Sequence, residues 1–139
     1  MFRLSHYMQE ILVPISPGEL LDKITILRIK AVRIQDAAKL ANVRRELGLL
    51  ETQWRGALPA GVDVASEEGA LEAVNAKLWE VEDLLRDLEA EKRFDDRFVE
   101  LARAVYINND ERAAIKKRIN LALGSRIVEE KSYAPYARG

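Results

Sequence analysis

Two long apolar seams, separated by only a few residues, constrain this chain more than any other feature of its sequence. The first seam repeats at steps of three and four residues, with Leu71, Val74, Leu78, Val81, Leu85 and Leu88. The second repeats in the same way, with Phe98, Leu101, Val105, Asn108, Arg112, Ile115, Ile119 and Ala122. Such spacing predicts two helices of roughly 26 residues, each about 39 Å long. Because the connection between them is short, we expect a long antiparallel hairpin.

Two further helices are expected before this hairpin. In "ISPGELLDKITILRIKAVRI", Ser16 is a candidate N-cap, Pro17 takes the first helical position and Glu19 completes the pattern of a capping box. Asp36 can cap a second helix, whose apolar residues are Leu40, Val43, Leu47, Leu50 and Trp54. The hairpin cannot bury its seams alone, so these helices or a second subunit must cover it. We therefore predict an all-α fold, a helical bundle of about four main helices.

Local signals predict where the hairpin helices begin. The segment "RGALPAGVDVASEEG" is rich in glycine and contains proline, which indicates a loop. Ser66 is a candidate N-cap for the third helix, and Asp95 or Asp96 can cap the fourth. Phe94 could pack on Val99 as a hydrophobic staple. The hairpin turn is thus expected between about residues 90 and 95.

The length of the chain bounds its domain organisation. A chain of 139 residues fits a single helical domain spanning 1–139. Residues 1–15 contain "EILVPIS", which favours an extended arm or a short strand. Gly124 is a typical helix stop. Residues 125–139 are then a C-terminal tail, where Tyr133 and Tyr136 could anchor the chain on the bundle.

The composition argues against several classes of function. There are no cysteines and one histidine, His6, which disfavours thiolate or histidine metal sites. The net charge of −1 argues against a nucleic-acid binder. No segment approaches the ~20 consecutive apolar residues of a membrane span, and the start lacks a signal-peptide pattern. We expect a cytoplasmic protein with no nucleic-acid or membrane partner.

Polar residues interrupt the second seam. Asn108 and Arg112 occupy seam positions, and folding the hairpin about position 94 brings Arg112 opposite position 76, beside Asn75. We expect these three residues to share one layer. A buried guanidinium stays charged and needs an anionic partner. The candidate partners are Glu19, Asp22 and Glu80. Three interpretations stay open: a polar layer that fixes helix register, a seam that reaches solvent, and a pocket where Arg112 binds an anionic ligand.

The acids of the third helix suggest a metal-dependent alternative. Glu80 and Asp83, in "WEVEDLL", lie three residues apart on one helical face. Rows of carboxylates hold Mg²⁺ in helical enzymes that hydrolyse nucleoside triphosphates, because Mg²⁺ prefers oxygen ligands. The partner pair of glutamates on an earlier helix is not clearly present. A magnesium-dependent nucleoside triphosphate pyrophosphohydrolase is therefore one candidate activity.

Four blocks of the sequence carry a family resemblance. They are "PISPGELLDKITILRIK", "KLANVRRE", "LWEVEDLLRDLE" and "NNDERAAIKKRINLALGSRIVEEKSYAPY". Through them the chain resembles a family of short, mostly bacterial, all-helical proteins of unknown function. The resemblance begins at about Met8 and implies that residues 1–7 are an upstream extension. Relatives often lie near genes for surface-polysaccharide synthesis, so the resemblance implies a link to that process. It supplies no catalytic residues.

The sequence favours a protein that works by association, as a homo-dimer or an adaptor for another protein, without a cofactor. Ile26 and Ile29 lie partly outside the main stripe of the first helix, which indicates a second packed surface. The alternative is a small-molecule binder or enzyme. In that case Asn75, Asn108 and Arg112 would bind the ligand, and the acids of the third helix would hold Mg²⁺.

Overall fold

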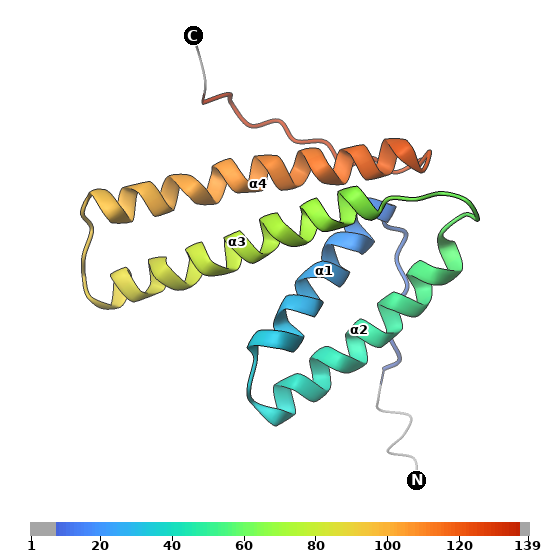
Figure 1. Ribbon diagram of the computed structural model, residues 1–139, viewed down its shortest axis with the longest axis horizontal. Helices are drawn as coiled ribbons and strands as arrows, with labels where there is room; N and C mark the ends of the chain where they lie inside the picture. Colours follow the sequence, from blue (N-terminus) through green and yellow to red (C-terminus); the bar gives the residue numbers. More distant parts are fainter. Residues whose placement is uncertain (1–7, 137–139) are drawn as a thin grey trace.

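The computed structural model describes residues 8–136 and contains four helices. They are α1 (Pro17–Arg33), α2 (Ala37–Ala57), α3 (Ala65–Ala90) and α4 (Asp96–Ala122), and no strand occurs in the described part of the chain. Helices α3 and α4 form a long antiparallel hairpin, and α1 and α2 form a shorter one (Figure 1). The predicted all-α bundle with its hairpin is confirmed. No helix in the described residues is long and apolar enough to cross a membrane.

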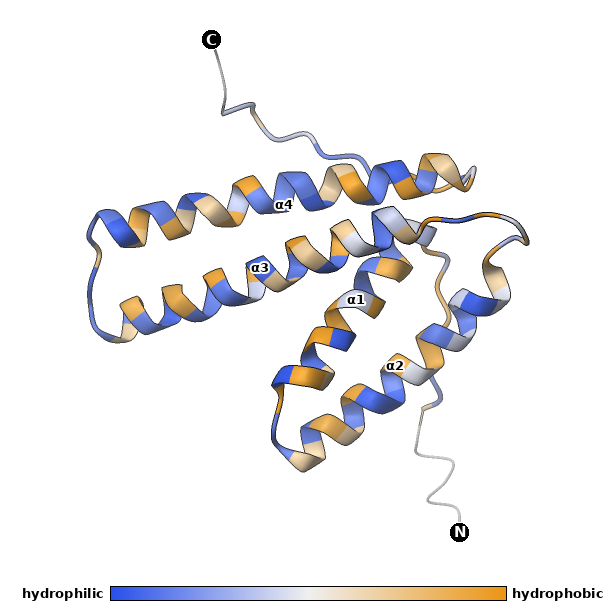
Figure 2. Cartoon of the chain, in the orientation of Figure 1, coloured by the Kyte–Doolittle hydropathy of each residue, from blue (hydrophilic) through white to orange (hydrophobic). Residues whose placement is uncertain are grey.

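Helix α1 holds the two hairpins together. It packs against α2 on one side and against α3 and α4 on the other, whereas α1 is the only one of the described helices on which α2 packs (Figure 1). Hydrophobic and hydrophilic residues alternate along each helix (Figure 2), as the seams require. The first helix thus packs on more than one neighbour, and Ile29 is buried whereas Ile26 is partly exposed.

Three of the expected N-caps are present. The side chains of Ser16, Asp36 and Asp95 accept hydrogen bonds from the backbone N–H three residues ahead, at 3.1, 2.9 and 3.2 Å. The predicted cap at Ser66 is wrong. Helix α3 already begins at Ala65, because the Asp63 carboxylate accepts the backbone N–H of Ala65 at 2.9 Å and turns the chain earlier.

At the predicted staple between Phe94 and Val99, the structure shows a ring contact with another residue. The Phe94 ring packs edge-on against Phe98, with centroids 5.2 Å apart, and Val99 is exposed. Phe98 lies on the seam that faces α3, so it is the nearer apolar neighbour. The turn beside it places Lys92 at a positive φ of 57°. Gly124 adopts a φ of 64° after α4 and ends that helix, as expected.

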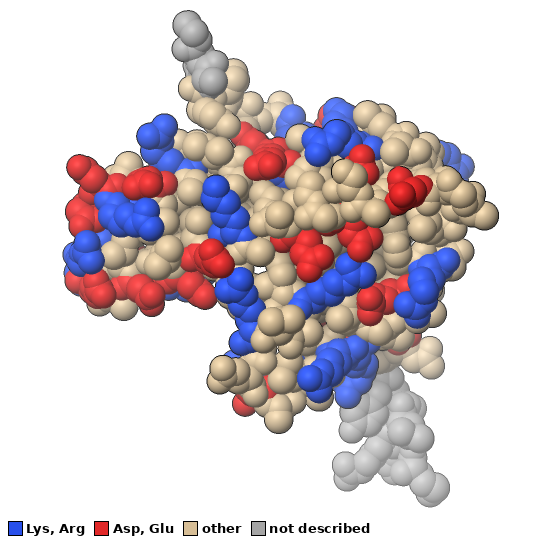
Figure 3. Space-filling model, viewed as in Figure 1, with Lys and Arg blue, Asp and Glu red and all other residues tan. Residues whose placement is uncertain are grey.

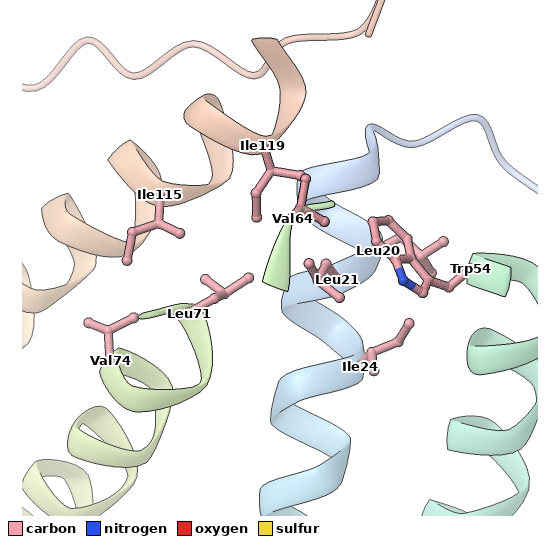
Figure 4. Close-up of a cluster of buried hydrophobic side chains, with 9 residues drawn as sticks. All are labelled: Leu20, Leu21, Ile24, Trp54, Val64, Leu71, Val74, Ile115 and Ile119. Atoms are coloured by element: carbon pink, nitrogen blue, oxygen red, sulfur yellow. The ribbon is translucent and has the colours of Figure 1, made fainter. Parts of the chain in front are cut away.

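The main core lies where α1 crosses the hairpin (Figure 4). Its buried side chains come from all four helices and from the loop before α3, and they are Leu20, Leu21, Ile24, Trp54, Val64, Leu71, Val74, Ile115 and Ile119. A smaller core farther along the hairpin is formed by Val81, Leu88 and Leu101, with partly buried neighbours. Helix α1 therefore covers only the half of the hairpin that lies nearest to it.

The segments outside the helices differ in their surroundings. Residues 8–15 form no strand and are exposed. Of the two structures expected for this segment, a short strand and an extended arm, the arm is the one that agrees with the described residues. Residues 125–136 have no regular structure and lie along α4 (Figure 1). Residues 1–7, the expected upstream extension with His6, lie outside the described residues, as do residues 137–139 of the tail.

Candidate functional site

A buried carboxylate is the centre of the polar groups where α1 meets the hairpin. The side chain of Asp22 on α1 is only 3% exposed. Its Oδ1 accepts a hydrogen bond at 2.9 Å from Asn75 Nδ2 on α3. The same Asn75 nitrogen also donates to Thr25 Oγ1 at 3.0 Å, and Thr25 donates to the backbone oxygen of Asp22 at 2.8 Å. These contacts fix the orientation of the Asp22 carboxylate.

Two cations on α4 approach this carboxylate. Arg112 Nε lies 3.5 Å from Asp22 Oδ1, and Lys116 Nζ lies 3.9 Å from Asp22 Oδ2. Lys116 is nearly buried and is also 2.6 Å from Glu19 Oε2 and 3.4 Å from Glu129 Oε2. Three carboxylates thus surround one buried ammonium, whereas Arg112 remains 31% exposed. The buried charges are therefore paired, as a low-dielectric interior requires.

The position of the Glu19 carboxylate corrects one expectation. Ser16 caps α1, but no hydrogen bond returns from the Glu19 side chain to Ser16. The Glu19 carboxylate instead contacts Lys116 at 2.6 Å and Lys23 at 3.8 Å. A buried ammonium attracts a carboxylate more strongly than a neutral backbone N–H does. Only the Ser16 half of the capping box is therefore formed.

Gly18 sets the distance between α1 and α4. Its backbone N–H donates to Asn120 Oδ1 at 2.7 Å, and both residues are buried. A Cβ atom at position 18 would lie 2.5 Å from the backbone oxygen of Lys116. Only glycine permits this approach without a shift of the helices. The close contact brings Asp22 and Glu19 within reach of the two cations on α4.

A cavity of about 560 Å³ lies between α4 and the C-terminal segment 125–136. Its lining residues are Val105, Tyr106, Asn109, Asp110, Arg112, Ala113, Lys116, Lys131, Tyr133, Ala134 and Tyr136. The segment is held on α4 by ion pairs from Lys116 and Lys117, to Glu129 at 3.4 Å and to Glu130 at 3.5 Å. A contact between the Tyr106 and Tyr136 rings, with centroids 5.3 Å apart, holds its far end.

Two ionisable groups of the segment, Glu129 and Lys131, have shifted pKa values. A hydrogen bond from Lys131, together with the nearby charge of Lys116, lowers the pKa of the Glu129 carboxyl below its usual value. Glu129 in turn raises the pKa of Lys131. The folded segment therefore favours the charged form of both groups, and their attraction is lost when acid protonates Glu129.

A second, more open cavity of about 440 Å³ lies between α1 and α3. Ile26, Ile29, Leu78 and Trp79 form its apolar wall. Arg112 and Asn109 line both this cavity and the larger one. Acidic and basic side chains are interspersed on the face shown in Figure 3, without one dominant patch. Arg112 is thus distinguished by its place between two cavities and not by a strong surrounding field.

The structure brings together two of the three residues expected to bind a ligand. Asn75 and Arg112 both contact Asp22, one of the partners proposed from the sequence. Asn108 is buried but donates to the backbone oxygen of Ala104 in its own helix at 2.7 Å. It therefore satisfies its amide locally, without a bond to the Asp22 cluster. Ligand binding by these residues stays a prediction.

The residues expected to hold Mg²⁺ do not form a cluster. Glu80 pairs with Arg33 at 3.3 Å, and Asp83 is an exposed residue on the wall of the second cavity. Within residues 8–136 no group of three or more histidine, cysteine or acidic side chains is placed to hold a metal ion. The geometry therefore adds no support to the magnesium alternative, which stays a prediction.

Sequence reasoning missed Lys116, Lys131 and Tyr106 as members of the site. Lys116 follows Arg112 by four residues and so lies on the same face of α4. Asp22 lies close to the apolar residues Leu21 and Ile24 in the sequence of α1. This position indicates a buried carboxylate that needs a charged or polar partner. Nothing in the local pattern of residues 125–136 indicated that this segment forms a cavity wall.

Comparison with known proteins identifies the family of the chain. A family model described as a family of unknown function, DUF6165, matches residues 11–137, so the chain belongs to this family. Comparisons with curated proteins and with solved structures gave no significant match. The expected membership of a family of unknown function is confirmed, and the bacterial distribution of its members stays an expectation.

Proposed function

We propose that this member of the DUF6165 family is a binding protein, and that Arg112 receives the anionic group of a small molecule in the cavity between α4 and residues 125–136. The observation that carries the proposal is the partly exposed guanidinium of Arg112, which lies 3.5 Å from the buried carboxylate of Asp22 and on the cavity wall. A volume of about 560 Å³ is typical of ligand pockets.

The geometry of Arg112 suits the recognition of an oxyanion. Its contact with Asp22 uses Nε, while the two terminal nitrogens carry four further N–H donors in a planar fork. Such a fork matches the oxygens of a carboxylate or phosphate. Asp22 is itself held by Asn75, so the Nε edge of the guanidinium already has a fixed carboxylate 3.5 Å away before a ligand arrives. Less entropy is then lost on binding.

The charges on the cavity wall also favour an anion. Three of the lining residues are basic (Arg112, Lys116 and Lys131), and one is acidic (Asp110). Each of these cations also pairs with a carboxylate outside the cavity lining: Arg112 with Asp22, Lys116 with Glu19, and Lys131 with Glu129. A bound anion therefore meets the cations first. Tight packing around Lys116 also reduces screening by water.

The experiment is thermal denaturation with sodium phosphate, pyrophosphate or citrate, each compared with sodium chloride at equal ionic strength. An anion present at 100 times its dissociation constant stabilises the folded protein by about 2.7 kcal/mol, a shift of several degrees. We expect Arg112→Ala to abolish that shift. The control is Arg103→Ala, which removes one exposed charge from α4 outside both cavities. The proposal is wrong if no anion stabilises the protein, or if Arg112→Ala responds like the control.

Association with a second copy is the other candidate function. It is favoured by the exposed arm, in which Met8, Ile11, Leu12 and Val13 are 64–82% exposed. Apolar residues gathered in this way are typical of interaction surfaces. Light scattering coupled to size exclusion would show a homo-dimer, and Leu12→Ser would weaken it. A monomer at high micromolar concentration would reject association. The link to surface-polysaccharide synthesis, the adaptor role and the cytoplasmic location stay predictions from the sequence.

A further inference from the structure

We infer that the molecule bound in the α4 cavity is a nucleoside phosphate, with its phosphate at Arg112 and its base against the tyrosine rim, defined here as Tyr106, Tyr133 and Tyr136. This inference rests on the proposed function and names its ligand class. The three rim residues line the same cavity as Arg112 and Lys131. Each wall therefore offers both a cation and a flat ring, with Arg112 and Tyr106 on α4 and Lys131, Tyr133 and Tyr136 on the segment 125–136.

The tyrosine rim is an unusual concentration of aromatic side chains for this protein. The chain has four tyrosines, and the three within the described residues all line the cavity. They are 43–78% exposed. The rings of Tyr106 and Tyr136 lie close to each other but are tilted by 56°, so neither ring covers the other face to face. Exposed aromatic faces of this kind stack on nucleic-acid bases with little preference for sequence.

The spacing along α4 fits a ring joined to a phosphate through a sugar. Tyr106 and Arg112 are six residues apart in one helix, a rise of about 9 Å. Asn109 lies halfway between them and also lines the cavity. A ligand that uses both ends therefore carries its anion and its ring about 9 Å apart, joined by a short linker. Inorganic phosphate alone would leave the rim unused, and an uncharged ring would leave the cations unused.

The polar residues between the two ends suit a nucleoside. The Asn109 amide can both donate and accept hydrogen bonds, and the Asp110 carboxylate accepts them. Ribose hydroxyls and the amino groups of bases are the donors that such groups recognise. The Asp110 carboxylate would repel a phosphate group beside it. The phosphate groups of the ligand are therefore expected at the end of the cavity near Arg112.

Isothermal titration calorimetry on the full chain tests this ligand class. The probes are ADP, UDP, inorganic pyrophosphate, adenosine and uridine at constant ionic strength. We expect ADP or UDP to bind at least about fivefold more tightly than pyrophosphate, because stacking of one base is worth about 1 kcal/mol or more. Tyr106→Ala and Tyr136→Ala should each weaken nucleotide binding by at least about fivefold and leave pyrophosphate binding unchanged.

A matched control removes an exposed ring from another place. Phe94 lies at the turn between α3 and α4, away from the cavity, so Phe94→Ala should change neither affinity. Far-UV circular dichroism checks that the variants are folded. Tyr136 lies outside the helices, and its variant carries the test if Tyr106→Ala does not fold.

The possible results separate this inference from the proposed function. If pyrophosphate binds as tightly as both nucleotides and the tyrosine variants have no effect, the base does not contribute. The nucleoside is then wrong, and the anion site stands. If neither the nucleotides nor pyrophosphate bind, or if Arg112→Ala leaves their affinity unchanged, both proposals are wrong. Binding of adenosine or uridine as tight as that of the nucleotides would overturn the role of the phosphate.

Discussion

Two regions of the same hairpin bury different kinds of side chain. In the junction, where α1 crosses α3 and α4 around Asp22, the buried residues include Asp22, Asn75, Lys116 and Asn120 beside the main apolar core. In the distal hairpin, residues 81–105, the buried side chains are Val81, Leu88 and Leu101. Its charged residues remain on the surface, as in the pair of Arg93 with Asp95.

The difference between the two regions follows from the presence of α1 in the junction. In the distal hairpin two helices cover each other, so charged side chains can always turn to solvent. In the junction α1 lies across the hairpin, and charges enclosed there must pair with one another. Paired buried charges add little net stability compared with an apolar core. The junction therefore encloses paired charges beside two cavities, whereas the distal hairpin buries apolar side chains.

The largest expected effect of a single substitution is at Asp22. Asp22→Ala removes the carboxylate between Lys116 and Arg112, and we expect a loss of about 3–5 kcal/mol in the free energy of unfolding. Urea denaturation followed by circular dichroism would measure it. The matched variant in the distal hairpin is Glu89→Ala, whose exposed ion pair with Lys92 contributes less than the junction pairs. Equal losses in the two variants would contradict the distinction between the regions.

A comparison of two buried leucines on α3 tests how strongly α1 covers the junction. Leu71 is fully buried in the main core. Leu71→Ala should lower the free energy of unfolding by about 3–4 kcal/mol, because the junction of three helices cannot collapse into the space left. Leu88→Ala should lower the free energy of unfolding by about 2 kcal/mol, since only α3 and α4 surround this site and they can approach each other to fill the space. Urea melts of both variants decide the order, and a larger loss at Leu88 would reverse our view of the two cores.

Gly18 and Gly48 provide a test of opposite sign. Alanine is favoured over glycine in a helix by roughly 1 kcal/mol, and nothing lies within 4 Å of a Cβ at Gly48, so Gly48→Ala should stabilise the protein. Gly18→Ala should destabilise it by about 1–3 kcal/mol, because its Cβ would meet the backbone oxygen of Lys116. Thermal denaturation of both variants gives the signs. Stabilisation by both would mean that α1 and α4 are not in close contact.

The smallest expected effect is at the turn of the distal hairpin. Lys92 has a positive φ of 57° and ends α3 as Gly124 ends α4. Glycine adopts this conformation without the steric cost of a side chain, so Lys92→Gly should stabilise the protein by about 0.5 kcal/mol. Gly124→Ala should destabilise it by about 1 kcal/mol for the same reason. Precise urea melts would detect both changes in the free energy of unfolding. A lower free energy of unfolding for Lys92→Gly would show that contacts of the lysine side chain stabilise the protein by more than the strain at its positive φ costs.

Much of the fold could be predicted from local physical chemistry. The seams at steps of three and four residues specify which side of each helix is apolar, and Ser16, Asp36 and Asp95 cap the helices where short polar side chains can accept a backbone N–H. The pairing of Arg112 with a carboxylate was also predictable, because a guanidinium stays protonated even when it is buried and so needs an anionic partner. The seams and caps depend on neighbours within one or two helical turns, and the charge of Arg112 depends on its residue type alone.

The sequence by itself thus determined four helices, most of their ends, the long hairpin and the unusual position of Arg112. Only the tertiary structure decided that Asp22, and not Glu19 or Glu80, receives Arg112, and that Asn108 bonds within its own helix. The choice depends on how closely and at what angle α1 crosses the hairpin, and Gly18 sets that distance. Periodicity specifies the apolar face of a helix but neither the helix that covers it nor the charges that the crossing encloses.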